Sequence, residues 1–430
     1  MTTERYSLAE VLAVAKTHPF YNPDIVYPAD AETIENLRKA VIDQKEKPKL
    51  LEQPLLEKKA LYKAIERLTH DVNPRNTYRQ SSYMSITGGG SGGVPMMFAV
   101  DVHENRRQRS QMGEFLKLCG VSQPGDWVLS IHTAGGFYSR LPCQHLAGDS
   151  SHVVQTVYHI SLMAKEDRDR VTLDKIIYTS EPLTGPQRAF IKTILGEVKI
   201  ISVMGSAEAG PWAISSPDLI GEQSLTSNST DFVIDTRNMV VEIVSPSVID
   251  GVSTPNPILL PQGEEGLIVQ TSLQRLRNPL VRYVTGDIGS LHPLPSAACA
   301  VIPEADWGHL RVLRMHGRDP RFSFKWFGCY FEFDRISAFM QEEECGILQW
   351  QILLGRLESS PQATLEIRLL RSPLRDGILS DDALIKRVEA FFIVLPENEP
   401  LFRVAFLDGL GGFERSATAG KVIKFVNRWD

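Results

Sequence analysis

The stretch Ser85-Ile86-Thr87-Gly88-Gly89-Gly90-Ser91-Gly92-Gly93-Val94-Pro95 decides our interpretation of this chain. Five of its eleven residues are glycine, and ordering so many glycines in a helix or strand costs much backbone entropy. The stretch is therefore predicted to be a loop, whose bare N–H groups can approach an anion closely. This favours an enzyme that handles nucleotide phosphates; a mobile surface linker is the alternative.

Two known nucleotide-binding loops do not fit this stretch. A Walker loop ends in Gly-Lys-Ser/Thr, whose lysine reaches the phosphates, but no lysine follows Gly93 here. The spacing of Gly88, Gly90 and Gly93 matches the dinucleotide fingerprint, which should open a helix directly. Instead Pro95 leads into the apolar run Met96–Val100, which is typical of a strand. We therefore expect the loop to join two strands.

Length and composition describe an ordinary globular protein. The 430 residues suffice for two or three domains. The composition, with 43% hydrophobic and 23% charged residues, argues against a disordered chain. The net charge of −6 provides no general attraction for nucleic acid or an acidic membrane. There is no apolar run of membrane-spanning length, and the start does not resemble a signal peptide. We expect a cytoplasmic protein that binds neither nucleic acid nor membrane.

The cysteines and histidines predict no metal held by protein ligands alone. The five cysteines include no C-x-x-C pair, so we interpret them as reduced, mostly buried thiols. The ten histidines form no H-x-x-x-H or H-E-x-x-H pair. A nucleotide-bound Mg²⁺ stays compatible with the sequence, because it needs only one or two carboxylates.

The order of predicted elements indicates an α/β fold. Residues 1–80 are mainly helical, with one helix capped by Ser7 and another beginning at Pro54. Later strands and helices alternate, and polar residues follow the strands, where open sheets bind ligands. The predicted strands are Trp127–Ile131, Lys175–Thr179 and Lys199–Met204, and Thr184–Leu195 is a predicted helix. Residues 220–315 change to short strands, which predicts a sheet or distorted barrel.

A domain boundary is predicted at Gly317–Pro320. Residues 1–317 would form a large N-terminal domain of layered α/β subdomains plus a β-rich subdomain. Residues 318–430, with a strand, a helix and another strand, would form a small, mobile α+β C-terminal domain.

Five stretches, in order, resemble the motifs of adenylate-forming enzymes, and within them the phenylacetate–CoA ligase-like branch. They are residues 87–95, Ser180-Glu181-Pro182, Met204-Gly205-Ser206-Ala207-Glu208, the pair Gly263–Gly266 and Arg282–Asp287, and Gly420-Lys421. The resemblance covers nearly the whole chain. It implies that a carboxylic acid reacts with ATP to give an acyl-adenylate and pyrophosphate, after which a thiol, commonly that of CoA, displaces AMP.

The resemblance also implies a set of site residues, most of them contacts of ATP or AMP. The phosphate loop would comprise Thr87, Gly88, Gly89, Gly90, Ser91, Gly92 and Gly93, and the adenine slot would lie among Ser180, Glu181, Pro182, Met204, Gly205, Ser206 and Ala207. Asp287 would accept hydrogen bonds from the ribose hydroxyls, and Arg318 would reach the ribose or a phosphate. Glu208 resembles the carboxylate that holds Mg²⁺. Lys421 matches the catalytic lysine of the mobile domain, with Lys424 as the fallback.

The acyl-substrate pocket is expected where two segments meet. By position, its lining would be His132, Gly135, Gly136, Phe137 and Tyr138, together with Ala207, Ala209 and Trp212. Aromatic walls suit a planar or aromatic acid. The alternative is that Phe137 and Trp212 belong to the ordinary core.

Two departures from the family pattern leave alternatives open. Val94 stands where the family has a lysine, which removes one cation from the phosphates. Pro320 would stiffen the hinge on which the second half-reaction depends. The acceptor could be CoA, or instead an amine or a carrier-protein thiol; a catalytically silent nucleotide-binding protein is the third hypothesis. A homodimer is left open.

Overall fold

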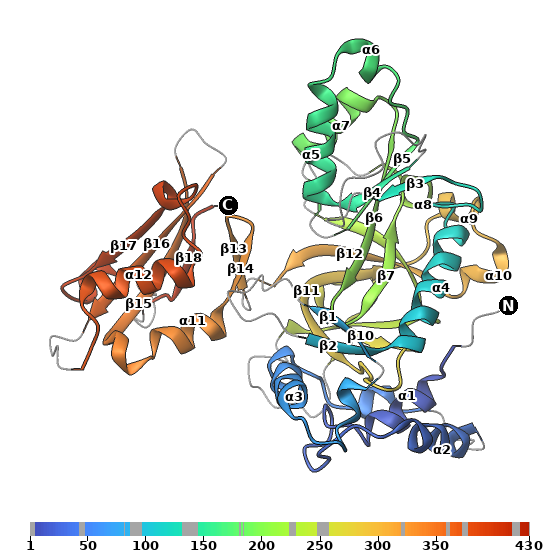
Figure 1. Ribbon diagram of the computed structural model, residues 1–430, viewed down its shortest axis with the longest axis horizontal. Helices are drawn as coiled ribbons and strands as arrows, with labels where there is room; N and C mark the ends of the chain where they lie inside the picture. The colour runs from blue at the N-terminus through green and yellow to red at the C-terminus, as the bar shows by residue number, and fades with distance from the viewer. Residues whose placement is uncertain are drawn as a thin grey trace. The chain divides into compact units, whose positions relative to one another are not determined.

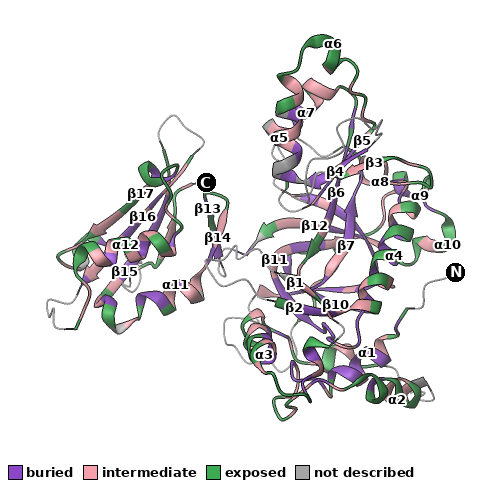
Figure 2. Cartoon of the chain, viewed as in Figure 1, coloured by how far each residue is buried: buried purple, intermediate pink, exposed green. Residues whose placement is uncertain are grey.

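The computed structural model describes most of the chain as two compact units that divide between Gly317 and Arg318. The described residues are 5–42, 48–80, 82–86, 97–130, 145–179, 182–183, 185–222, 229–246, 258–319, 323–357, 362–371, 377–414 and 422–429. Each unit has its own hydrophobic core, as the buried strands in Figure 2 show.

A helical segment opens the N-terminal unit. It contains α1 (Leu8–Ala15), α2 (Ala31–Ile42) and α3 (Lys58–His70). Ser7 caps α1 as expected, because its side chain accepts the Glu10 N–H in a capping box. The prediction that α3 begins at Pro54 was wrong. Residues before Lys58 are extended because Leu56 pairs with the sheet, donating its N–H to the Arg282 carbonyl at 2.9 Å.

A ten-stranded mixed sheet forms the body of this unit (Figure 1). Its order is β3 (Val128–Ser130), β4 (His145–Asp149), β5 (Lys175–Thr179), β6 (Lys199–Ser206), β7 (Gly210–Ser215), β8 (Thr230–Asp235), β12 (Leu310–Arg318), β11 (Tyr283–His292), β10 (Gly266–Ser272) and β9 (Met239–Val244). Strands β3 to β6 are parallel, whereas β7 runs antiparallel to both β6 and β8. The predicted α/β fold class is confirmed, and its β-rich part continues the same sheet.

Helices cover both faces of the sheet. Ile200 packs with α5 (Ser150–Ser161) and α7 (Gly185–Leu195), whereas its neighbour Ile201 packs with α4 (Val102–Leu118). Successive residues of a strand point to opposite faces, so α4 lies on one side of β6 and the α5–α7 pair on the other. Short helices α6 (Lys165–Arg168), α8 (Pro217–Ile220), α9 (Ser296–Cys299) and α10 (Glu304–Trp307) complete the unit.

A separate two-stranded sheet flanks the glycine-rich stretch. It consists of β1 (Ser82–Ile86) and β2 (Met97–Asp101), which are antiparallel with Ile86 opposite Met97. The expectation that two strands flank the glycine-rich stretch is confirmed, although residues 87–96 themselves lie outside the described part of the chain.

The C-terminal unit packs a hairpin and two helices against a small sheet. The hairpin is β13 (Ser323–Trp326) with β14 (Cys329–Glu332), and the sheet order is β17 (Phe402–Phe406), β16 (Ala363–Arg371), β15 (Ile347–Arg356) and β18 (Phe425–Asn427). The helices are α11 (Phe333–Met340) and α12 (Asp381–Phe391). The structure thus contains the predicted α+β elements. The mobility of this unit stays a prediction.

A buried ion pair fixes the N-terminal segment to the main sheet. Arg282, which is fully buried, binds Glu242 of β9 through two nitrogens at 3.1 and 2.9 Å. The same guanidinium donates to the carbonyls of Leu51 and Gln53 at 3.1 and 2.6 Å. Its backbone occupies the left-handed region, with φ 46°, a strained conformation that the four side-chain bonds help to hold.

Replacing Arg282 should therefore strongly destabilise the N-terminal unit. We expect Arg282→Met to cost about 3 kcal/mol, because Glu242 keeps a buried charge without its partner. The matched control is Arg314→Met, which removes a two-bond pair with Asp231 from an arginine whose side chain is 43% exposed. Such exposed pairs contribute about 1 kcal/mol or less. Urea unfolding of both variants measures the difference, and equal losses would contradict the assigned role.

Candidate active site

The hairpin of β6 and β7 presents Glu208 in a tight turn formed by residues 207–209. Gly205 has no room for a side chain, since a Cβ there would lie 2.8 Å from the carbonyl oxygen of Gly210. Gly210 combines a φ of +71° with close contact, because its Cβ would lie 2.6 Å from Gln108 Nε2. The glycines on either side of Glu208 are therefore required by the turn geometry.

Two tyrosine hydroxyls hold the side chain of Glu208. The Tyr62 hydroxyl on α3 donates to Oε1 at 2.6 Å, and the Tyr283 hydroxyl on β11 donates to the same oxygen at 3.2 Å. Glu208 is only 6% exposed. Burial raises the pKa of this carboxyl, but the Tyr62 hydroxyl, the residue's own N–H and the charge of Lys58 outweigh it and bring the pKa below its ordinary value. The carboxylate is therefore ionised at neutral pH.

The backbone of the turn is fixed by a buried polar network. Arg275 donates to the Glu208 carbonyl through Nη1, and Gln108 Nε2 donates to the Ala209 carbonyl at 2.6 Å. Gln108 also bonds Gln274 at 3.1 Å, and Gln274 bonds Gln111 at 2.8 Å. Burial lowers the pKa of Arg275 to about 10, which still leaves a cation. The turn is thus held from α4 and from the β10–β11 connection.

Asp287 lies within β11, four residues after Tyr283. The strand bulges here, as Gly286 has φ +79° and the register to β10 shifts between Leu267 and Val269. The Asp287 N–H donates to Thr285 Oγ1 at 3.0 Å. Asp287 is half-buried, so the bulge places a carboxylate at the edge of solvent on the strand that also contacts Glu208.

The other described site candidates lie in β6, in the Glu208 turn, in β7 and after β5. Met204 and Ala207 are half-buried, Gly205 and Ser206 are exposed, and Pro182 is exposed beyond β5. Ser206 Oγ accepts the Ala209 N–H at 3.0 Å, which closes the turn. Ala209 and Trp212 are buried in the main core cluster, and their place in an acyl pocket stays a prediction.

Many predicted residues fall outside the described part of the chain. They are Thr87, Gly88, Gly89, Gly90, Ser91, Gly92 and Gly93 of the phosphate loop; Ser180 and Glu181; His132, Gly135, Gly136, Phe137 and Tyr138; and Lys421. The side chain of Arg318 is also outside it. Lys424, the fallback for Lys421, is described: its ammonium donates to Gln349 and to the Trp350 carbonyl and lies 4.6 Å from the centre of the Trp350 ring.

Sequence reasoning missed four residues that hold Glu208, namely Tyr62, Gln108, Arg275 and Tyr283. One signal was present: Glu104, Gln108 and Gln111 follow helical spacing and form a polar face of α4 that is buried. No local pattern marks Tyr62, because its partner is 146 residues away.

The site suits a metal brought by a ligand rather than one held by the protein alone. Among the described residues, no three His, Cys, Asp or Glu side chains form a metal-binding group. A single ionised carboxylate such as Glu208 is sufficient for Mg²⁺ whose other ligands are phosphates and water.

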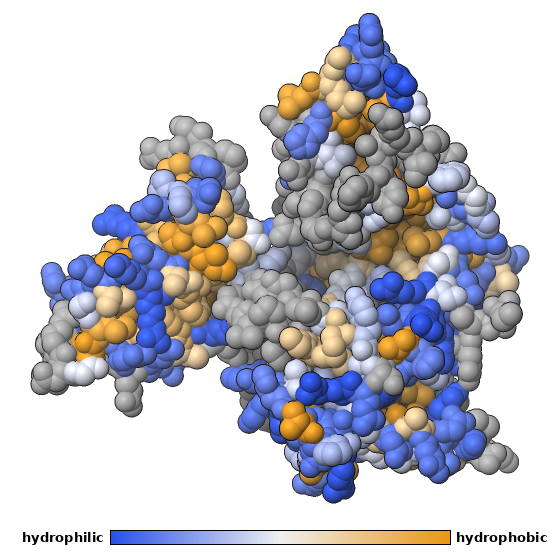
Figure 3. Space-filling model, in the orientation of Figure 1, coloured by the Kyte–Doolittle hydropathy of each residue, from blue (hydrophilic) through white to orange (hydrophobic). Residues whose placement is uncertain are grey.

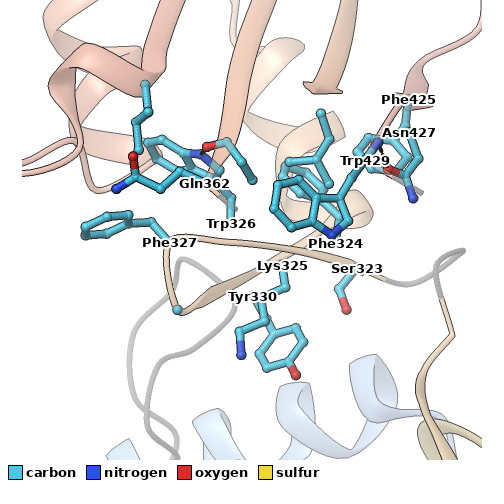
Figure 4. A pocket seen from close by; sticks show the side chains of 14 residues that line it. Ser323, Phe324, Lys325, Trp326, Phe327, Tyr330, Gln362, Phe425, Asn427 and Trp429 are labelled. Atoms are coloured by element: carbon cyan, nitrogen blue, oxygen red, sulfur yellow. Dashed lines mark hydrogen bonds between the residues drawn. The ribbon is translucent and has the colours of Figure 1, made fainter. Parts of the chain in front are cut away.

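A separate cavity of about 570 Å³ lies within the C-terminal unit (Figure 4). Aromatic residues dominate its lining, among them Phe324, Trp326, Phe425 and Trp429, with Lys325 among the polar residues. Phe324 stacks on Phe425 with ring centres 4.8 Å apart. Figure 3 shows apolar side chains on the surface of this unit. The described lining contains none of the predicted site residues.

Comparison with known proteins identifies the fold. No family model matches the chain, and no curated protein matches its sequence. Among solved structures, 2-hydroxyisobutyryl-CoA ligase in complex with 2-HIB-AMP and CoA matches 97% of this chain and 87% of its own at 15% identity, with a TM-score of 0.59. Amide bond synthetase McbA from Marinactinospora thermotolerans matches 80% of this chain and 68% of its own at 15% identity, with a TM-score of 0.47. The chain therefore shares its fold with this CoA ligase.

None of the described helices is both long and apolar enough to cross a membrane.

The geometry of the Glu208 turn gives a testable prediction for Gly210. We expect Gly210→Ala to lower the free energy of unfolding by about 1 kcal/mol for the left-handed backbone, plus about 1 to 2 kcal/mol for displacing the buried amide of Gln108. The control is Gly196→Ala, because Gly196 has φ +75° and nothing within 4 Å of its Cβ position. Urea unfolding should show the larger loss at Gly210; equal losses would mean that Gln108 does not restrain the turn.

Proposed function

We propose that the chain uses ATP and Mg²⁺ to activate a carboxylic acid as an acyl-adenylate, releasing pyrophosphate, and then transfers the acyl group to CoA. The acid would be aromatic or another small organic acid. The observation that carries the proposal is the buried, ionised Glu208 on a braced turn. The resemblance of five sequence motifs and the fold shared with a CoA ligase support it.

In the first step, a carboxylate oxygen of the acid attacks the α-phosphorus of ATP. A new P–O bond forms, and the bond to pyrophosphate breaks. Such a step needs alignment and charge neutralisation more than covalent help. We propose that the ammonium group of Lys421 is the cation that bridges the α-phosphate and the carboxylate of the acid. The N–H groups of residues 88–93 and the hydroxyls of Thr87 and Ser91 would donate to the β- and γ-phosphates.

Glu208 would supply the protein's ligand to the magnesium ion that accompanies the nucleotide. Bound to the triphosphate, Mg²⁺ would neutralise charge on the departing pyrophosphate. The low pKa of Glu208 fits this role, because only the ionised carboxylate is a good ligand for a hard cation.

The remaining contacts would orient the nucleotide and the acid. Asp287 would accept from both ribose hydroxyls, and Arg318 would reach the ribose or a phosphate. The adenine would lie among Ser180, Glu181, Pro182 and Met204 to Ala207. The acid would lie among His132, Gly135 to Tyr138, Ala209 and Trp212.

In the second step, the CoA thiol gives up its proton to solvent and its sulfur attacks the acyl carbon; a C–S bond forms, and AMP leaves with the electrons of the C–O bond. We propose that residues 318–430 move between the two steps, as a mobile C-terminal domain. The alternative acceptor is an amine or a carrier-protein thiol. Pro320 would stiffen the hinge on which this movement depends, so it supports adenylation more than thioester formation.

The most direct test is pyrophosphate release over a panel of aryl and alkyl acids, with and without CoA. Release accompanied by a thioester when CoA is present supports the full proposal. An amide formed with an amine, and no thioester with CoA, would assign the alternative acceptor. If no acid in the panel releases pyrophosphate and calorimetry detects no ATP binding, the proposed adenylation is wrong.

Lys421 provides a second test. We expect Lys421→Ala to slow adenylate formation about 100-fold, as for other removed transition-state donors, while ATP binding measured by calorimetry changes little. Lys424→Ala is the matched control, because this nearby lysine already binds Gln349 and Trp350. Unchanged rates for Lys421→Ala, or a loss confined to Lys424→Ala, would remove Lys421 from the mechanism.

A further inference from the structure

We infer that Tyr62 and Tyr283 are positioning residues that orient the carboxylate of Glu208 for a divalent cation carried by a nucleotide. This inference rests on the proposed function, and it adds two residues to which the sequence analysis assigned no role, although Tyr283 lies within the motif stretch Arg282–Asp287. Both tyrosines act through Glu208, so neither needs to touch the cation or the substrate.

The first support is the convergence of the two hydroxyls on one atom. Tyr62 and Tyr283 come from different elements, and both donate to Oε1 of Glu208, at 2.6 and 3.2 Å. A glutamate side chain has three rotatable bonds, whereas each tyrosine ring has two, and Tyr283 is buried. Two such donors define where the carboxylate lies and restrict its rotation. Hydrogen bonds of this kind commonly orient carboxylates that bind metals.

The second support is the way in which the two tyrosines are held relative to each other. Leu56 forms a β-bridge with Tyr283, and the Val284 N–H donates to the Leu56 carbonyl at 3.0 Å. Helix α3 begins two residues later and buries Leu61 and Ile65 beside Tyr62. The segment from Leu56 to Tyr62 therefore ties helix α3 to the strand that carries Tyr283, which fixes the two hydroxyl donors relative to each other.

The third support is that the main chain of Glu208 is braced independently of its side chain. Arg275 binds its carbonyl, and Gln108 binds the carbonyl of Ala209. Loss of one tyrosine hydroxyl should leave this bracing in place. The effect of the tyrosines on the cation can thus be separated from their effect on the fold.

The experiment measures Mn²⁺ binding by electron paramagnetic resonance in the presence of α,β-methylene-ATP, using the full chain. We expect Tyr62→Phe to weaken Mn²⁺ binding about 10-fold, and Tyr62→Phe with Tyr283→Phe to weaken it further, towards 100-fold. In a Glu208→Gln background, Tyr62→Phe should have no additional effect, because the oriented carboxylate is already absent.

The matched control is Tyr27→Phe. Tyr27 also donates its hydroxyl to a carboxylate, Oδ2 of Asp71 at 2.9 Å, in the same unit. Parent-like Mn²⁺ binding is expected for this variant. Thermal unfolding of each variant checks that the fold is retained.

The outcomes separate this inference from the proposed function. If Glu208→Gln loses Mn²⁺ while Tyr62→Phe and the double variant bind it like the parent, the inference fails and the proposed metal site stands. If Tyr27→Phe weakens binding as much as Tyr62→Phe, the tyrosines have no specific positioning role. If the parent itself binds no Mn²⁺ with the analogue, both proposals fail.

Discussion

A buried carboxylate must find hydrogen-bond donors, and this requirement organises much of the polar interior of the N-terminal unit. Glu208 is only 6% exposed, so its charge would be costly without hydrogen-bond donors. Donors come to it from α3 and β11, and its turn is held from α4 and from the β10–β11 connection. A buried charge that accepts hydrogen bonds from two elements, on a turn braced from two further places, is costly for stability alone, and such an arrangement is typical of functional sites.

The same requirement explains why the N-terminal segment is attached to the sheet so firmly. Tyr62 can reach Glu208 only if α3 begins at a fixed place. The Leu56 bridge and the buried Arg282–Glu242 pair provide that fixed start. Removing the pair would therefore disturb both the core and the geometry of the site. Arg282, whose backbone is strained, directly precedes Tyr283 in the chain. The strained residue is therefore next to one of the two residues that bind the Glu208 carboxylate.

The C-terminal unit has a separate core of its own. Its core is rich in aromatic side chains, with Phe324, Phe331 and Phe425 in stacked contacts, and the only described lysine near the predicted catalytic position is bound within the unit. A unit with its own core can keep its structure while moving as a body, which the proposed two-step reaction needs.

The sequence by itself determined the elements whose signal is local. Short apolar runs predicted β5 and β6, and the Ser7 cap predicted α1. Apolar runs and helix-capping residues are features of neighbouring residues, so they can be recognised from the sequence alone. Only the tertiary structure decided where α3 begins, that the α/β and β-rich parts share one sheet, and that Tyr62, Gln108, Arg275 and Tyr283 hold Glu208. These contacts join residues 67 to 146 positions apart, and no local pattern encodes a partner at such distances.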